Sequence, residues 1–268
     1  MTRSPLGLSA DQIAATAAAL ADAAAAETLP RFRAATLDVA TKDRDGFDPV
    51  TEADRAAEAA MRAVLAASRP EDGILGEELA RRPSQSGLTW VLDPIDGTRA
   101  FVIGAPTWGT LIALTDAEGR PLYGVIDQPH TGERWEGGLG RAAFTGPRGT
   151  VPLAARRTAA LGEAYLCTTF PEIGTGGDRA AFERVAGQAR LTRYGLDCYA
   201  YGLVASGHVD LVVEAGLAPY DICAPIAVIE AAGGVVTDWQ GGPAQAGGQV
   251  LAASNARLHG AALALLAE

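Results

Sequence analysis

The feature that most constrains this chain is an apolar segment that ends in two carboxylates, "WVLDPIDGT" at residues 90–98. Asp93 and Asp96 are separated only by a proline and an isoleucine, and the residues before them are apolar, as in a buried strand. Moving one unpaired carboxylate out of water is unfavourable, and two close together also repel each other. The segment is therefore either an exposed turn, which Asp, Pro and Gly all favour, or a strand end where a cation lies between the carboxylates.

The remaining pattern is that of an α/β (α+β) protein in two parts. Helical patterns and short apolar strands come first, then an antiparallel meander, and after about residue 150 strands and helices alternate, which favours layered α/β packing. The segment 145–160, with several Pro and Gly residues, is the predicted boundary. We expect an N-terminal α+β part, residues 1–150, and a C-terminal α/β part, residues 151–268. The expected helices are 8–34 and 51–68, the expected strands 73–77 and 89–93, and the expected meander 108–144.

The composition limits the class of protein. The chain has 268 residues, a formal net charge of −10 and 48% hydrophobic residues, which is typical of a soluble globular protein and not of a general nucleic-acid binder. No segment resembles a targeting signal or a membrane span, so a cytoplasmic location is the default expectation. Cys167, Cys198 and Cys223 have no paired spacing and are interpreted as buried free thiols.

Acidic residues recur where strands are expected to end or helices to begin. Asp54 lies in "DPVTEAD", Glu77 in "ILGEE", and Asp221 in "PYDICA". Oxygen ligands suit a hard divalent cation such as Mg²⁺, and no Cys or His spacing favours a softer metal. Gly97 and Thr98 follow the second aspartate and are expected to open a helix, whose free N–H groups bind anions. Together these features indicate metal-assisted phosphoryl transfer, in which two metals about 3.5–4 Å apart stabilise the attacking and leaving oxygens.

The four segments "DPVTEAD", "GEE", "DPIDGT" and "PYDICA" resemble the inositol monophosphatase family in order and approximate spacing. The resemblance runs from about residue 9 to the C-terminus, and it is the combination that is specific, because each motif alone is weak. It implies a layered αβαβα sandwich and Mg²⁺-dependent hydrolysis of small phosphate monoesters. It also implies a homodimer, and family members are often inhibited by lithium.

The resemblance also implies a role for each matching residue. Glu77, Asp93 and the Ile95 carbonyl would hold one Mg²⁺, with a third, weaker ion near Glu77. Asp93, Asp96 and Asp221 would hold a second ion, with Asp93 bridging. Thr98 and Asp54 would orient or deprotonate the water that attacks phosphorus, and the N–H groups of Gly97 and Thr98 would hold phosphate oxygens.

Lys42 stands out because it is the only lysine among the 22 Lys and Arg residues. Lysine is a compact point charge and does not replace arginine at every site. The resembled family has a lysine before its "VTxxD" segment that contacts the water network of the metal site, and Lys42 fits that place. A surface lysine without function is the alternative.

Other polar and aromatic residues are interpreted as structural. Glu78 is taken as a solvated neighbour and Asp48 as a turn residue. The three histidines are expected at the surface or in structural contacts, and three tryptophans in the core or a pocket wall. These residues are His130, His208, His259, Trp90, Trp108 and Trp135.

The substrate is inferred from acidic residues of the second half. Glu214 stands where the family places a carboxylate that contacts the substrate, and Asp197 where polyol-specific members tend to carry a small or apolar residue. With Asp96 they would give the leaving-group pocket a negative face, which suits a cationic alcohol. Several stretches resemble the histidinol-phosphatase branch, so L-histidinol phosphate is the expected substrate, with Arg193 structural or paired with a pocket carboxylate. The alternatives are inositol-1-phosphate hydrolysis and a binding or regulatory protein without catalysis.

Overall fold

The computed structural model describes residues 9–34, 39–41 and 49–267. A seven-stranded sheet has the order β3-β4-β5-β6-β7-β8-β9. Only β3 and β4 pair in parallel, and the rest form the antiparallel meander that the sequence predicts. The strands are β3 (Gly73–Gly76), β4 (Thr89–Asp96), β5 (Gly109–Thr115), β6 (Pro121–Gln128), β7 (Glu133–Gly138), β8 (Arg141–Gly146) and β9 (Gly149–Pro152).

A second, five-stranded sheet has the order β11-β10-β12-β14-β13 and belongs to the C-terminal part. It is mixed, because β10 pairs in parallel with β11 and β12, whereas β14 pairs antiparallel with β12 and β13. Its strands are β10 (Tyr165–Thr168), β11 (Leu191–Tyr194), β12 (Leu211–Leu217), β13 (Val235–Thr237) and β14 (Gly248–Ala253). A short hairpin, β1 (Val39–Thr41) with β2 (Pro49–Thr51), lies outside both sheets.

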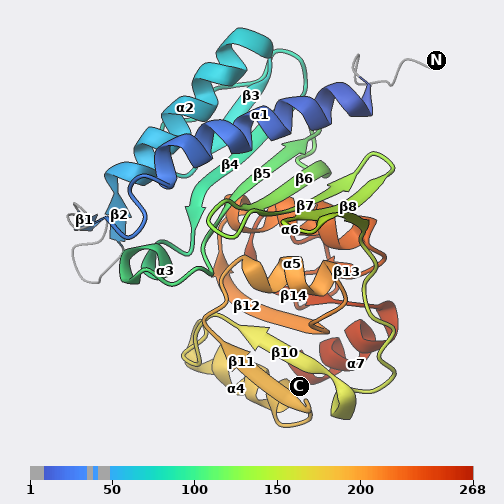
Figure 1. Cartoon of the computed structure of the whole chain (residues 1–268). Helices are drawn as coiled ribbons and strands as arrows, with labels where there is room; N and C mark the ends of the chain where they lie inside the picture. The colour runs from blue at the N-terminus through green and yellow to red at the C-terminus, as the bar shows by residue number, and fades with distance from the viewer. Residues whose placement is uncertain (1–8, 35–38, 42–48, 268) are drawn as a thin grey trace.

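Helices cover both sheets and separate them, which gives the layered αβαβα sandwich (Figure 1). The first layer is α1 with α2, which pack on each other and on the large sheet. The middle layer is α5 with α6, and the last is α4 with α7 on the far side of the small sheet. The helices are α1 (Ala10–Thr28), α2 (Glu52–Ser68), α3 (Thr98–Ile103), α4 (Gly176–Ala186), α5 (Tyr199–Ala205), α6 (Pro219–Ala231) and α7 (Ala256–Leu266), with a 3₁₀ turn η1 (Leu161–Glu163).

The sequence pattern places most elements correctly but misjudges some ends. A capping box starts α1, because Ser9 Oγ accepts from the N–H of Gln12 at 3.2 Å and the Gln12 side chain accepts from the N–H of Ser9 at 2.9 Å. The helix ends at Thr28 and not at residue 34, and Pro30, which has no N–H to donate, follows at once. Strand β4 continues through Asp96, so both carboxylates of the opening motif belong to the strand.

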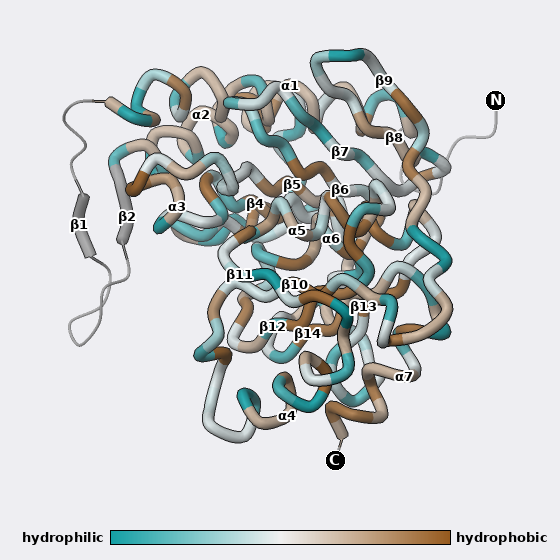
Figure 2. The backbone as a smooth tube through the Cα atoms, turned by 60° about the horizontal axis from the view of Figure 1, so that its bottom comes forward, coloured by the Kyte–Doolittle hydropathy of each residue, from teal (hydrophilic) through white to brown (hydrophobic). Residues whose placement is uncertain are grey.

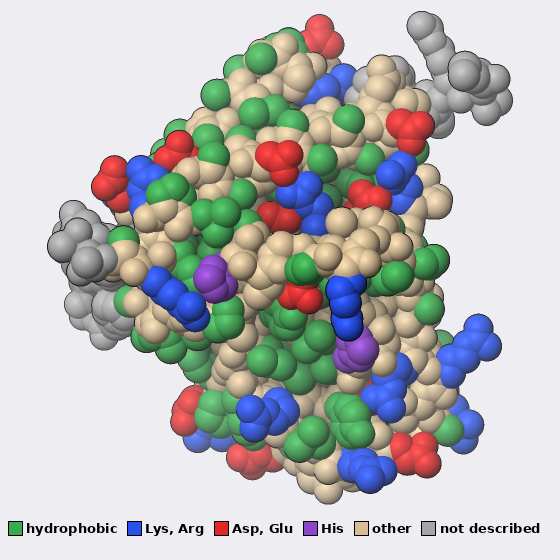
Figure 3. All heavy atoms as spheres, viewed as in Figure 1, with side chains coloured by type: hydrophobic (Ala, Val, Ile, Leu, Met, Phe, Trp, Pro, Cys, Tyr) green, Lys and Arg blue, Asp and Glu red, His purple; other side chains and the backbone are tan. Residues whose placement is uncertain are grey.

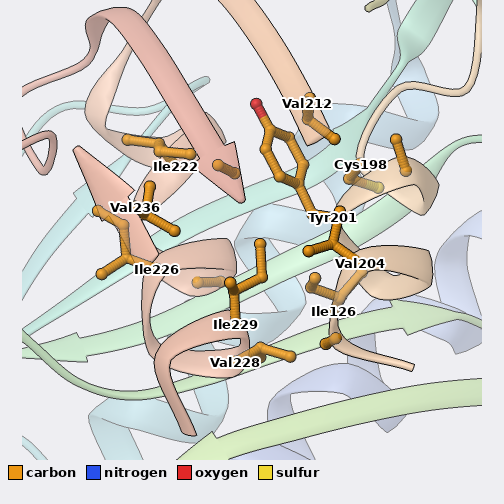
Figure 4. Packing of buried hydrophobic residues seen from close by; sticks show 14 of the residues in the cluster. Ile126, Cys198, Tyr201, Val204, Val212, Ile222, Ile226, Val228, Ile229 and Val236 are labelled. Carbon is orange, nitrogen blue, oxygen red and sulfur yellow. The ribbon is translucent and has the colours of Figure 1, made fainter. Parts of the chain in front are cut away.

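The middle layer joins the two parts of the chain. Helix α6 packs on β5, β6 and β7 of the large sheet and on β13 of the small one. In Figure 2 hydrophobic residues are concentrated along the central strands and α6, and many hydrophilic residues lie towards the periphery. Figure 4 shows part of the buried cluster in this layer, to which Ile126, Val204, Val212 and Ile222 all belong. The large sheet ends at Pro152, near the predicted boundary, but the two parts share this core.

A pair of glycines lets α6 approach the large sheet closely. Gly124 on β6 and Gly137 on β7 are directly opposite each other in the strand pairing. A Cβ atom at Gly124 would lie 2.5 Å from the carbonyl oxygen of Ala224, and one at Gly137 would lie 2.5 Å from the Cα of Val228. Only a residue without a side chain fits under the helix backbone at these two positions.

Candidate active site

Three predicted metal ligands meet at the junction of the two sheets. One carboxylate oxygen from each of Asp93, Asp96 and Asp221 lies within 4.8 Å of the others. In a regular strand, residues three apart point to opposite faces. The pairing of β4 with β5 shifts register between Asp93 and Asp96, and this irregularity allows both side chains to face the start of α6.

Glu77 lies beside this cluster because β3 is the parallel neighbour of β4. Gly76 pairs with Leu92, and the N–H of Glu77 donates to the Leu92 carbonyl at 3.2 Å. The Glu77 carboxylate hydrogen-bonds to Asp93 and, after burial, is the largest influence that raises the Asp93 pKa. The predicted ligand set of Glu77, Asp93, Asp96 and Asp221 is therefore assembled at one place.

Burial and mutual repulsion make this arrangement unfavourable without a cation. The pKa of Asp93 is raised by burial first, and then by the charges of Glu77, Asp96 and Asp221. Burial also raises the pKa of Asp96, followed by the charges of Asp221 and Asp197. A divalent cation would offset both effects, and a set of donors made only of oxygen fits a hard ion such as Mg²⁺.

Main-chain donors fix the three carboxylates in place. The N–H of Ile95 donates to Asp93 Oδ1 at 3.1 Å, and the N–H of Cys198 donates to Asp96 Oδ2 at 2.6 Å. The N–H of Ala218 donates to Asp221 Oδ2 at 2.7 Å, so Asp221 caps its own helix. Each of the three carboxylates is therefore held by a donor that belongs to the backbone.

The turn after Asp96 requires glycine for two reasons. Gly97 has φ +80°, in the left-handed region, and a Cβ there would lie 2.8 Å from the side chain of Asp197. Thr98 then begins α3, and its hydroxyl donates to the Ile95 carbonyl at 3.1 Å. That carbonyl is the one predicted to bind a metal, so the hydroxyl lies next to the predicted ligands.

Asp54 lies on α2, beside a residue that packs against the same turn. It lies in the first turn of the helix and its side chain is fully buried. Its neighbour Ala53 packs in one apolar cluster with Ile95 and Phe101, on either side of the turn. The predicted residues Lys42 and Asp48 lie outside the described residues.

A cavity of about 340 Å³ opens beside the carboxylate cluster. The predicted substrate residues Asp197 and Glu214 are both in its wall. Its lining comes from both parts of the chain and includes Asp96, Gly97, Thr98, Arg99, Thr169, Phe170, Cys198, Tyr201 and Asp221.

Asp197 is held in this wall by a strained backbone and one hydroxyl. Its φ is +47°, which is unusual for a residue other than glycine, although aspartate tolerates it better than most. The Thr107 hydroxyl donates to Asp197 Oδ2 at 2.8 Å. Burial raises the pKa of Asp197, while the Thr107 hydrogen bond and the charge of Arg99 oppose the shift.

Glu214 is the more buried of the two pocket carboxylates. It accepts hydrogen bonds from the Thr168 hydroxyl at 3.1 Å, and from the N–H and hydroxyl of Thr169 at 2.6 and 2.8 Å. Burial outweighs these bonds and raises the pKa of Glu214 to about 7. The residue therefore changes charge close to neutral pH.

Two sequence interpretations differ from the structure. Arg193 is exposed on β11 and is not among the residues that line the cavity, so the structure does not bring it to the site. Glu78 is not solvated: its side chain is 2% exposed and lies 3.9 Å from Arg55. The short motif around Glu78 did not indicate that α2 would bury its side chain.

The structural assignments of the tryptophans, cysteines and histidines are confirmed. The three tryptophans are buried, and the three cysteines are buried and free. His130 packs edge-on against Phe32, His259 bonds to the Thr237 hydroxyl at 2.8 Å, and His208 is exposed. No histidine lines the cavity at the described residues.

Several residues of the site carried no recognisable signal. Thr107, Thr168 and Thr169 orient the pocket carboxylates, but isolated threonines are common in strands and loops. Arg99 and Phe170 come from different parts of the chain, and the guanidinium carbon lies 4.9 Å from the ring centre, a cation–π contact across the cavity wall. Only Arg99 could have been suspected, since it follows Thr98 directly.

Comparisons with known proteins identify the family and the fold. The model of the "Inositol monophosphatase family" matches residues 9–268. The chain is 38% identical to a protein named histidinol-phosphatase from Mycobacterium tuberculosis, over 90% of this chain and 93% of that one. It is 43% identical to the bifunctional phosphatase IMPL2, chloroplastic, from Arabidopsis thaliana, over 86% of this chain and 65% of that protein. A solved inositol monophosphatase from Zymomonas mobilis superposes with a TM-score of 0.86 at 43% identity, covering 97% of this chain and 100% of the other.

Proposed function

Because this chain belongs to the inositol monophosphatase family of phosphatases, we propose that it is a Mg²⁺-dependent phosphomonoesterase that hydrolyses L-histidinol phosphate to L-histidinol and phosphate. One observation carries the proposal. A cluster of three carboxylates, Asp93, Asp96 and Asp221, lines the same region as a cavity whose wall carries Asp197 and Glu214. The cluster suits the reaction and the acidic wall suits the substrate.

The metal ligands come from both parts of the chain. Glu77, Asp93 and the carbonyl of Ile95 would hold one Mg²⁺, and Asp93, Asp96 and Asp221 a second, in keeping with the family resemblance. When bound, Mg²⁺ supplies Lewis-acid stabilisation of the negative charge that develops on the phosphoryl group. A third ion near Glu77 belongs to the same proposal.

The chain's own groups would position the reactants. The Thr98 hydroxyl and the Asp54 carboxylate would orient the attacking water, and Asp54 would accept its proton. The N–H groups of Gly97 and Thr98 would donate to phosphate oxygens. Such positioning can supply a large part of a rate enhancement, because the entropy of bringing the reactants together is lost on binding and not in the transition state.

The preference for histidinol phosphate rests on the charge of the pocket. Asp96, Asp197 and Glu214 give the cavity wall several carboxylates, with Arg99 as the basic residue among its lining. Histidinol carries an amine and an imidazole, whereas inositol is neutral. Complementary charge favours the cationic alcohol over the neutral one.

Phosphate release with and without Mg²⁺ tests the function directly. The substrates are histidinol phosphate, inositol-1-phosphate, fructose-1,6-bisphosphate and adenosine 3′,5′-bisphosphate, and a chelator provides the metal-free arm. We expect the highest kcat/KM on histidinol phosphate, and we expect the chelator to abolish this activity. Preference for inositol-1-phosphate would select the second candidate, which the Zymomonas mobilis structure favours. No hydrolysis of any ester would indicate a binding or regulatory protein.

Replacing Asp197 with asparagine is expected to narrow the preference for histidinol phosphate over inositol-1-phosphate. The asparagine side chain has nearly the same volume and can still accept from Thr107, but it lacks the negative charge. Losing one charge-assisted hydrogen bond costs about 1.5–3 kcal/mol, or roughly ten- to a hundred-fold in the ratio of the two kcat/KM values. A ratio unchanged in the Asp197→Asn variant would remove this residue from substrate selection.

Substrate binding should depend on the ionisation of Glu214. Below pH 7 its carboxyl is protonated and neutral, and above pH 7 it is negative and attracts a cationic leaving group. The ratio of KM in Glu214→Gln to KM in the wild type, measured on histidinol phosphate from pH 5.5 to 8.5, should therefore rise with pH. Taking this ratio cancels the titration of the substrate itself, and a flat ratio would contradict the role.

The expected partners remain part of the proposal. The ligand would be a small phosphorylated metabolite, the chain would bind neither nucleic acid nor membrane, and it would form a homodimer in the cytoplasm. On the face shown in Figure 3, basic and acidic side chains are interspersed. None of the helices in residues 9–34 and 49–267 is both long and apolar enough to span a bilayer.

A further inference from the structure

Helix α2 carries charged residues on a side that is partly buried. Asp54, Glu58 and Arg62 recur every four residues, so they lie along one side of the helix. Asp54 and Glu58 are 0% exposed. A buried carboxylate is unfavourable unless it is paired or hydrogen-bonded, so the contacts of Glu58 indicate why it is tolerated there.

Glu58 holds the segment that follows β3. Its Oε1 accepts from Arg62 Nε at 2.7 Å, and its Oε2 accepts from the N–H of Glu78 at 2.7 Å. Arg62 also donates through Nη2 to the carbonyl of Leu79 at 3.1 Å. Helix α2 therefore binds the main chain at two successive residues, directly after Glu77.

Gly76 is the residue that allows this approach. A Cβ atom at this position would fall on the Glu58 carboxylate. The N–H of Glu77 donates to Leu92 on β4. The backbone of Glu77 is therefore held on both sides. Its own N–H bonds to β4, and the N–H of the next residue bonds to the Glu58 carboxylate.

We propose that Glu58 is a positioning residue that orders Glu77 for metal binding, an inference that rests on the proposed Mg²⁺-dependent function. Glu58 binds the backbone beside the predicted ligand and not the cation. Ordering Glu77 in advance reduces the entropy that is lost when the ion binds. Outer partners of metal ligands typically contribute roughly 10- to 100-fold to metal affinity.

The chain contains a matched control for this proposal at the other end of the same strand. Asp72 precedes β3, whereas Glu77 follows it. Asp72 is 1% exposed, pairs with Arg69 at 2.7 Å and accepts from Trp90 Nε1 at 3.0 Å. Its replacement removes a buried, paired carboxylate without touching the segment that carries Glu77.

The test compares Glu58→Gln with Asp72→Asn. Mg²⁺ affinity is measured by calorimetry on the full chain, and stability by denaturant unfolding in a chelator. Both variants should be less stable than the wild type, but only Glu58→Gln should bind Mg²⁺ at least tenfold more weakly. Gly76→Ala keeps every charge but displaces the Glu58 carboxylate, so its Mg²⁺ affinity should also fall. If Glu58→Gln does not fold, the Mg²⁺ affinity of Gly76→Ala is the test.

The outcomes separate this inference from the proposed function. Unchanged Mg²⁺ affinity in Glu58→Gln, or an equal loss in Asp72→Asn, would overturn the positioning role while the wild type still binds the ion. A wild-type chain that does not bind Mg²⁺ would overturn the metal-dependent function itself, and the positioning role with it.

Discussion

Replacing Asp93 with asparagine is expected to abolish nearly all phosphate release and to weaken Mg²⁺ binding. Asp93 lies among Glu77, Asp96 and Asp221, and it would bridge two ions. Loss of a bridging ligand should cost more than the roughly 10- to 100-fold in affinity that follows loss of an outer partner. Calorimetric titration with Mg²⁺, together with a phosphate-release assay, checks both effects.

The same substitution should not weaken the fold when no metal is present. Burial and three neighbouring carboxylates raise the pKa of Asp93, so its ionised form opposes folding, and this penalty grows as pH rises. Asparagine removes one of the repelling charges and its Oδ1 can still accept from Ile95. Denaturant unfolding at neutral pH in a chelator should give a stability at least equal to that of the wild type.

The variant Asp127→Asn is the control for Asp93→Asn. Asp127 is a buried carboxylate on the same sheet, but it pairs with Arg134 at 2.6 Å and lies outside the ligand cluster. This variant should keep its Mg²⁺ affinity, because Asp127 is not among the clustered carboxylates. If Asp93→Asn keeps both Mg²⁺ affinity and activity, the two-metal assignment is wrong.

Replacing Thr98 with alanine is expected to lower kcat by roughly a hundredfold while KM changes little. Misplacing a reactant by about 1 Å can cost a hundredfold, and an interaction that acts mainly in the transition state appears in kcat. The hydroxyl donates to the Ile95 carbonyl, so its position is already fixed. Steady-state kinetics on the preferred substrate gives kcat and KM separately for the variant and the wild type.

Thr98→Ser separates positioning from helix stability. Serine keeps the hydroxyl and removes only a methyl group, so kcat should stay within a few-fold of the wild type. Near-normal kcat in Thr98→Ala would mean that the residue only stabilises the start of α3. Unfolding measurements on both variants show whether the helix start is affected.

The carboxylate cluster could be predicted from the sequence because it depends on the order and spacing of the motifs along the chain. The segments around Glu77, Asp93 and Asp221 fall at strand ends and a helix start, where a layered fold brings side chains together. The spacing alone did not predict how Asp93 and Asp96 come to face the same side. That depends on the shift of register between β4 and β5, which is a property of the pairing.

The cavity beside the cluster was less predictable, because side-chain direction there depends on backbone conformation and burial. Asp197 faces the cavity with φ +47°, a conformation that no local pattern indicates. Arg193 was expected to be structural or to pair with a pocket carboxylate, but in β11 it is exposed and outside the cavity lining. Glu78 was expected to be solvated, but it is buried against α2. The sequence did not indicate this, because α2 comes from a distant part of the chain.

Gly124 and Gly137, which face each other under α6, affect the site although β6 and β7 contribute none of the clustered carboxylates. Asp221 lies in the first turn of α6, and Ala224 and Val228 of the same helix rest on Gly124 and Gly137. A methyl group at either glycine would lift the helix and move Asp221 relative to Asp93, which is fixed in the sheet. The distance between carboxylates therefore constrains which side chains these two positions can carry, although neither glycine contacts substrate or ion.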